Sequence, residues 1–199
     1  GAPADDTLLT ALLLTDDCRP LATLVNYACH PTTLAWENTL ILRAGNKLPV
    51  VEHTRFERDY LDAAREVERP RRDDARVLVV GAFCEQPPLG LIKSLEISGC
   101  AIVWDDFTLG GRWLTADVDA YGDPIAALSR AYLEHSESSA VRYEPTEEKG
   151  KALLDKVRHT GADGVVFAAP SFCDPALLDA PMLQQALDDA GVPWTAFKY

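Results

Sequence analysis

Apolar runs of strand length alternate with helix-like segments along most of the chain. The strand-like runs lie near residues 76–83, 100–104, 163–168 and 192–198. The helical segments lie near residues 54–68, 88–98, 123–136, 147–159 and 181–191. Repeated alternation of strand and helix predicts a doubly wound α/β fold with a mainly parallel sheet, of the flavodoxin or Rossmann type.

Residues 1–39 have a different pattern. Two apolar segments, 7–14 and 21–28, flank the polar turn 16–20, which is typical of a β-hairpin. A two-stranded hairpin is too small to hold a core of its own. We therefore expect this segment to be a small N-terminal β-hairpin appendage, and residues 40–199 to form a C-terminal α/β domain.

Charge and cysteine content narrow the classes of function. The chain has 31 acidic and 19 basic residues, for a net charge of -12, which argues against binding to nucleic acid or to an anionic membrane. Its five cysteines show no CxxC pair and no disulfide-like spacing, which favours a reducing compartment. No apolar run reaches transmembrane length and no basic leader precedes an apolar one, so we expect a cytoplasmic protein.

Two cysteines, Cys84 and Cys173, are the first candidates for chemistry. Each follows a strand-like run and precedes a helix start, and ligands in open parallel sheets collect at the carboxyl ends of strands. Helix N-termini favour thiolates, the form that binds metals and attacks electrophiles. The ordinary interpretation is a small apolar residue at a strand end, with Asp174 capping a short helix at Pro175. Polar neighbours and the adjacent double proline favour a functional role for Cys84.

The remaining candidates are weaker. His30 follows a strand-like run and could bind zinc, but zinc requires three or four protein ligands. We interpret His53, His135 and His159 as structural and Cys100 as buried and inert.

Charged residues near the expected strand ends leave alternatives open. Either Asp105 and Asp106 are both solvated, or one of them is a carboxylate of the functional site. Lys93 and Arg112 could contact a phosphate-bearing ligand, although a surface position is the ordinary expectation. There is no G-x-G-x-x-G or Walker sequence, so we expect no nucleotide to bind to this chain itself.

These motifs resemble a known family over about four-fifths of the chain. Residues 40–199 are similar to the C-terminal part of the benzoyl-CoA reductase / 2-hydroxyacyl-CoA dehydratase family, and most to its C-type (gamma) reductase subunits. The matching stretches are residues 42–45, 48–50, 52–53, 81–94 (GAFCEQPPLGLIKS), 98–100 and 164–178 (GVVFAAPSFCDPALL).

The resemblance implies an iron–sulfur enzyme. Members bind a [4Fe–4S] cluster near an acyl-CoA thioester, with cysteine ligands from more than one domain. Cys173 matches the ligand of the C-terminal domain, and Cys84 matches the reductase-like motif as a second candidate. An ATP-hydrolysing activator with its own iron–sulfur cluster supplies low-potential electrons. The reductases dearomatise an aromatic acyl-CoA, whereas the dehydratases eliminate water through a ketyl radical.

Residues 1–39 are similar instead to a fragment of the neutral ceramidase-like family, in which the histidine matching His30 helps to hold zinc. The other zinc ligands and the nucleophile have no counterpart here, so we expect no amidase activity. The reductase family's N-terminal domain, with further cluster cysteines, has no match either.

We therefore expect a fragment of a reductase-like iron–sulfur subunit that is inactive alone and works with a related subunit. The alternatives are a dehydratase subunit, a non-catalytic binding or assembly domain, and, more weakly, a zinc amidohydrolase.

Overall fold

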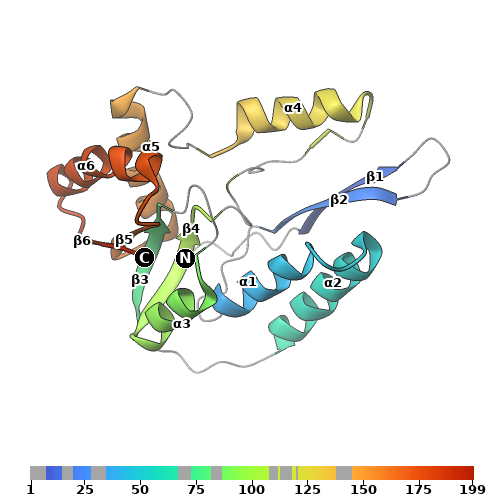
Figure 1. Cartoon of the computed structure of the whole chain (residues 1–199), viewed down its shortest axis with the longest axis horizontal. Helices are drawn as coiled ribbons and strands as arrows, with labels where there is room; N and C mark the ends of the chain where they lie inside the picture. The colour runs from blue at the N-terminus through green and yellow to red at the C-terminus, as the bar shows by residue number, and fades with distance from the viewer. Residues whose placement is uncertain are drawn as a thin grey trace.

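The computed structural model describes residues 8–14, 20–27, 35–66, 73–81, 87–107, 112, 118–119, 121–137 and 145–199. Strands β1 (Leu8–Leu14) and β2 (Pro20–Tyr27) pair antiparallel, which confirms the predicted hairpin. Figure 1 shows this hairpin above helices α1 (Ala35–Ala44) and α2 (Val50–Glu66). Helix α1 crosses the expected boundary between residues 39 and 40. No described helix is both long and apolar enough to cross a membrane.

The main sheet has four parallel strands in the order β4-β3-β5-β6. These are β3 (Ala75–Val80), β4 (Cys100–Asp105), β5 (Gly164–Ala169) and β6 (Trp194–Lys198). The chain runs outward from β3 to β4 and then returns across the sheet to β5. The switch point, where ligands gather in such folds, therefore lies between the carboxyl ends of β3 and β5. This topology confirms the predicted doubly wound α/β fold.

Helices cover both faces of this sheet. Helix α3 (Leu89–Ile97) packs on one face, where Ile92 is 1% exposed. Helices α5 (Thr146–Thr160) and α6 (Asp174–Asp189) pack on the other face through Leu153, Val157 and Leu187. A further helix, α4 (Pro124–His135), stands apart from the sheet in Figure 1.

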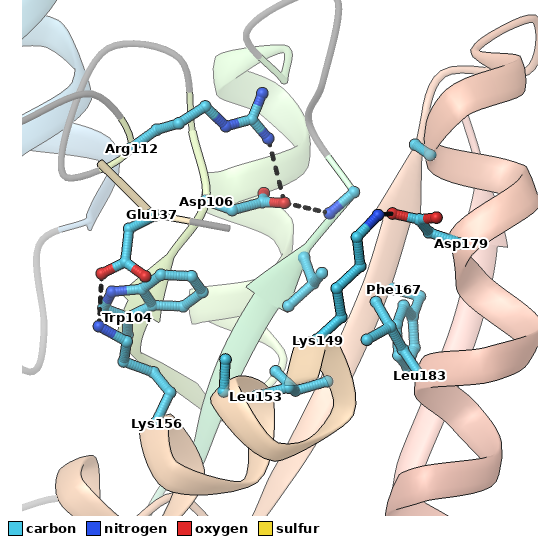
Figure 2. Close-up of a pocket in the computed structure, with 14 residues that line it drawn as sticks. Trp104, Asp106, Arg112, Glu137, Lys149, Leu153, Lys156, Phe167, Asp179 and Leu183 are labelled. Carbon is cyan, nitrogen blue, oxygen red and sulfur yellow. Dashed lines mark hydrogen bonds and ion pairs between the residues drawn. The ribbon is translucent and has the colours of Figure 1, made fainter. Parts of the chain in front are cut away.

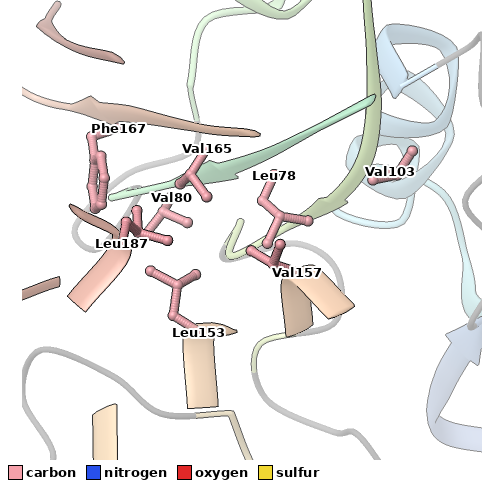
Figure 3. Packing of buried hydrophobic residues seen from close by; sticks show 8 residues of the cluster. All are labelled: Leu78, Val80, Val103, Leu153, Val157, Val165, Phe167 and Leu187. Carbon is pink, nitrogen blue, oxygen red and sulfur yellow. The ribbon is translucent and has the colours of Figure 1, made fainter. Parts of the chain in front are cut away.

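Successive side chains of β3 point to opposite faces of the sheet, so β3 contributes to the core on each face. Val77 and Val79 face α3, whereas Leu78 and Val80 face α5 and α6. Figure 3 shows the second cluster, which joins Leu78 and Val80 of β3 to residues from β4, β5, α5 and α6. Because both faces are covered, the strands are continuous apolar runs rather than alternating ones, as expected of parallel sheets.

A bulge in β4 changes which of its side chains face α3 and which face α5 and α6. Val77 lies opposite Ile102, but Leu78 lies opposite Trp104, so Val103 is the extra residue. Val103 and Trp104 consequently both pack on the α5–α6 side. Asp105 lies opposite Val79 and therefore takes the α3 side of the sheet.

Asp105 is a buried carboxyl on that side. Its Oδ1 accepts a hydrogen bond from the Phe107 N–H at 3.0 Å. Burial is the main cause that raises its pKa to about 7, and the neighbouring charge of Asp106 raises it further, while the Phe107 hydrogen bond and Arg112 lower it. Near neutral pH this carboxyl is therefore divided between its protonated and ionised forms.

Helix α6 differs from the sequence prediction. The sequence indicated a short helix at Pro175 and a second helix from near residue 181, but the structure has one continuous helix with Pro181 inside it. Cys173 occupies the N-cap position without a side-chain cap bond, so the prediction that Asp174 caps the helix was wrong. The helix continues through Pro181 because Ala176 on one side and Leu187 on the other are both buried, which outweighs a local proline defect of about 3 kcal/mol.

We expect Leu187→Ala to lower the free energy of unfolding by about 2–5 kcal/mol, because Leu187 is 0% exposed and its removal leaves a cavity between α6 and the sheet. The matched control is Leu178→Ala on the same helix, whose side chain is 78% exposed; its effect should stay within about 0.5 kcal/mol. Urea unfolding followed by circular dichroism measures both. Equal effects would contradict the described packing of α6.

We expect Asp105→Asn to stabilise the protein more at pH 8 than at pH 4. Folding raises the pKa of Asp105 from 3.8 to about 7, so the folded state binds this proton more tightly, and the contribution of Asp105 to stability falls as pH rises between those values. An amide cannot ionise, which removes this fall. Urea unfolding from pH 4 to 8 tests it. Asp155→Asn, at an exposed pair with Arg158, is measured alongside as the control for replacing a carboxylate by an amide.

Candidate functional site

A pocket opens at the carboxyl edge of the sheet on the α5–α6 side (Figure 2). Its cavity volume is about 90 Å³. The larger apolar side chains that line it are Val80, Trp104, Leu153, Phe167 and Leu183. Its charged side chains are Asp106, Arg112, Glu137, Lys149, Lys156 and Asp179. The bulge in β4 creates this composition, because it turns both Trp104 and Asp106 toward the helices of this face.

Each described cation that lines the pocket is paired with a carboxylate, as the dashed lines of Figure 2 show. The pairs are Arg112 with Asp106 at 3.2 Å, Lys149 with Asp179 at 2.8 Å, and Lys156 with Glu137 at 2.6 Å. The Lys156 ammonium also lies 4.9 Å from the centre of the Trp104 ring. Because the charges of these described residues cancel in pairs, the lining suits an uncharged group better than a free anion.

Asp106 connects two strand ends at this edge. One oxygen, Oδ2, accepts a hydrogen bond from the Gly81 N–H at 2.8 Å and also faces Arg112. Gly81 has a φ of +116°, and a Cβ atom there would lie 3.0 Å from the Ala168 carbonyl oxygen. Only glycine suits this position between β4 and β5. The end of β3 is therefore held on the β4 side by the Asp106 hydrogen bond and on the β5 side by the close approach of Ala168.

The structure gives the positions of the two acidic residues and the two basic ones. Asp106 lines the pocket, whereas Asp105 lies on the opposite face. Arg112 is 6% exposed and paired, so the expected surface position was wrong. Burial beside Asp106 is the physical reason, since a guanidinium enters the interior only with a carboxylate partner. Lys93 is exposed, as expected.

Cys173 lies at the switch point, between the end of β5 and the first turn of α6. Its N–H donates to the Pro170 carbonyl at 3.0 Å, and its own carbonyl accepts from Leu177 at 3.0 Å. The residue is 2% exposed and packs with Ala169 and Ala176. Ala176 also lines the pocket, so Cys173 lies one helical turn from it on the same face of α6.

The backbone beside Cys173 is held by Tyr199, the residue after β6. The N–H and the hydroxyl of Ser171 both donate to the Tyr199 carbonyl oxygen, at 2.8 Å and 2.9 Å. The side chain of the next residue, Phe172, is 98% exposed. The turn is thus fixed in place while it presents an aromatic side chain to solvent.

Two predicted site residues, Cys84 and His30, lie outside the described residues, as do Cys18 and Cys29. Cys100 is half-buried, and burial, followed by the charge of Asp74, raises its thiol pKa, which fits an inert role. Within the described ranges, no group of three or more histidine, cysteine or acidic residues could hold a metal ion. A [4Fe–4S] cluster is typically held by four cysteines. The described residues therefore do not by themselves form a complete cluster site.

The histidine of the first matching motif has a packing role. His53 Nε2–H donates to the Ile41 carbonyl at 2.8 Å, and its ring lies against Gly45, where a Cβ atom would come within 2.7 Å. The same nitrogen is 3.5 Å from Glu57. Burial raises the pKa of Glu57, and His53 opposes that shift. These contacts join α1 to α2, in agreement with the structural interpretation of His53.

Sequence reasoning missed four pocket residues: Glu137, Lys149, Lys156 and Asp179. Lys149 and Lys156 are seven residues apart, which places both on one face of a helix and was a usable indication. Their carboxylate partners come from distant segments, so no spacing in the sequence joins the pairs.

Comparisons with known proteins support the family resemblance. The family model "2-hydroxyglutaryl-CoA dehydratase, D-component" matches residues 5–199. Because this match includes most of residues 1–39, the expected ceramidase-like resemblance of that segment has no support.

Curated relatives agree. The chain is 53% identical over 161 residues to the C-type subunit of benzoyl-CoA reductase from Thauera aromatica, covering 80% of this chain and 42% of the relative. It is 25% identical to the (R)-phenyllactyl-CoA dehydratase beta subunit of Clostridium sporogenes, covering 77% and 40%. It is 30% identical to the beta subunit of lactoyl-CoA dehydratase from Anaerotignum propionicum, covering 60% and 32%.

The chain thus spans less than half the length of these relatives. With the family model matched over nearly all of its residues, the chain belongs to the benzoyl-CoA reductase / 2-hydroxyacyl-CoA dehydratase family.

Proposed function

We propose that this chain is part of an iron–sulfur subunit of an ATP-dependent benzoyl-CoA reductase-like enzyme, which dearomatises an aromatic acyl-CoA by two-electron reduction. In this proposal Cys173 supplies one thiolate ligand to a [4Fe–4S] cluster. The other ligands come from Cys84 or from parts of the enzyme beyond the described residues. The carrying observation is the position of Cys173 at the switch point of the sheet, in a chain 53% identical to a reductase subunit.

The surroundings of Cys173 suit a metal ligand. Cys173 lies at the N-terminus of a 16-residue helix, the positive end of the helix dipole. The apolar contacts with Ala169 and Ala176 exclude water. When bound, such a cluster supplies one-electron transfer at a potential that burial and hydrogen bonding tune. The residues of this chain would hold and orient it.

The partners follow from the same proposal. All of the relatives named above are subunits, so we propose a companion subunit of the same enzyme. A separate ATP-hydrolysing activator with its own iron–sulfur cluster would deliver the electrons. The acyl-CoA would be bound by the assembled enzyme, and this chain alone would be inactive.

A 2-hydroxyacyl-CoA dehydratase subunit is the second candidate. The description of the family model and the beta-subunit relatives favour it, but their identities of 25% and 30% are well below 53%. Product analysis separates the two functions. The enzyme assembled with this chain and an activator should convert benzoyl-CoA to a dearomatised thioester. Elimination of water from a 2-hydroxyacyl-CoA instead would establish the dehydratase.

We expect Cys173→Ala to lower the iron and sulfide that the assembled enzyme takes up during anaerobic reconstitution, because one thiolate ligand is removed. The chain would be combined with the other subunits of the Thauera aromatica reductase, produced without that enzyme's own C-type subunit. Iron, acid-labile sulfide and visible absorbance would be measured per complex.

The matched control is Cys100→Ala, which removes the other described thiol, on the α3 side of the sheet. It should leave iron uptake unchanged. Thermal unfolding of both variants checks that the fold is retained. Iron uptake that is the same with and without the Cys173 thiol would rule out its role as a ligand.

A further inference from the structure

Helix α4 is firmly initiated and lies away from the main sheet. Asp123 caps it, accepting a hydrogen bond from the Ile125 N–H at 2.9 Å, and Pro124 occupies the first turn. No other described helix or strand packs extensively against it, and it stands apart in Figure 1.

One side of α4 is apolar and exposed. Ile125, Leu128 and Tyr132 follow a spacing of three and four residues, which places them on one face, and Tyr121 extends this face just before the helix. We call these four residues the α4 stripe. The exposed fractions are 88% for Tyr121, 68% for Ile125 and 51% for Tyr132, and Leu128 is half-buried. Ala127 and Ala131, on the adjacent face, are buried.

The end of α4 is anchored, so the stripe is presented at a defined place. The Glu137 N–H donates to the Arg112 carbonyl at 3.0 Å. The Glu137 carboxylate pairs with Lys156 at 2.6 Å, and the Lys156 ammonium lies over the Trp104 ring. These contacts tie the segment after α4 to β4 and α5. A rigidly mounted apolar helix face is typical of a docking surface.

Charge and the known relatives together indicate what kind of partner covers the α4 stripe. Charges on and beside α4 are mixed, with Asp123 and Glu134 accompanied by Arg130 and His135. Two copies of a chain with a net charge of -12 repel each other, which opposes self-association. The named relatives are all subunits of enzymes, which favours a different polypeptide as the occupant.

We propose that the α4 stripe is the docking surface for the companion subunit of the enzyme, which would receive it in an apolar groove with room for two tyrosine rings. This inference rests on the proposed function, because it presumes a companion subunit. Large aromatic side chains that become buried at an interface contribute most of its binding energy.

The test uses this chain and the other subunits of the Thauera aromatica benzoyl-CoA reductase, produced together without that enzyme's own C-type subunit. The binding of wild type is compared with that of a variant carrying both Ile125→Arg and Tyr132→Arg. We expect the dissociation constant to rise at least about tenfold in the variant. The control is Ile97→Arg at the end of α3, whose side chain is 71% exposed, and it should bind like wild type.

A second measurement identifies what lies on the stripe. A photo-reactive phenylalanine derivative replaces Tyr132, and the cross-linked partner is identified by mass spectrometry. A cross-link to a companion subunit supports the proposal. Cross-links only between copies of this chain would overturn it. Circular dichroism and thermal unfolding check that the exposed substitutions leave the fold intact.

The outcomes separate this inference from the proposed function. If wild type binds the subunits and the double variant binds equally well, the stripe is not the docking surface, and the proposed function stands. If wild type does not bind the subunits at all, both are overturned.

Discussion

Strand β3 is buried between two helical layers and paired with a strand on each side, and the rest of the domain is built on it. Leu78 and Val79 are 0% and 1% exposed, on opposite faces. Burial of such side chains contributes about 1.5–3 kcal/mol each, and it joins α3 on one face to α5 and α6 on the other. Because β4 and β5 both run parallel to β3, their carboxyl ends meet at the same edge of the sheet. The pocket, the Asp106 contacts and Cys173 all lie there for this reason.

The bulge in β4 decides the chemistry of that edge. One extra residue, Val103, exchanges the faces taken by the residues after it. Trp104 and Asp106 consequently reach the α5–α6 side, where they line the pocket together with ion-paired residues. Asp105 is left on the α3 side, where burial raises its pKa to about 7. A regular strand would have placed Asp105 in the pocket and Asp106 on the other face.

The ion pair of Glu137 and Lys156 links two features that are otherwise separate. Both residues line the pocket, and the same contact anchors the end of α4. The proposed docking surface and the pocket at the carboxyl edge thus share one structural support. Cys173 lies one helical turn from the pocket. Contacts therefore run along the sheet edge from Cys173, through the pocket, to the end of α4.

The sequence by itself determined the alternation of strands and helices, and with it the doubly wound fold. This prediction succeeds because a strand buried on both faces is a continuous apolar run, whereas a helix shows apolar residues at helical spacing. A packed α/β domain requires both patterns. Local motifs also placed Cys173 correctly at a strand end and identified the family. The continuity of α6 was missed because Pro181 locally indicates a helix boundary, whereas burial along the whole helix overrides it.

Only the tertiary structure decided which residues come together. In α2 the apolar Phe56 is 44% exposed, whereas the charged Glu57 is buried beside His53. Arg112 is predicted at the surface until Asp106 is brought to it. The bulge at Val103 has no local signature, because an extra valine in an apolar run leaves the pattern unchanged. Pairing between distant segments depends on the path of the chain in space, which the order of residues encodes only through the whole fold.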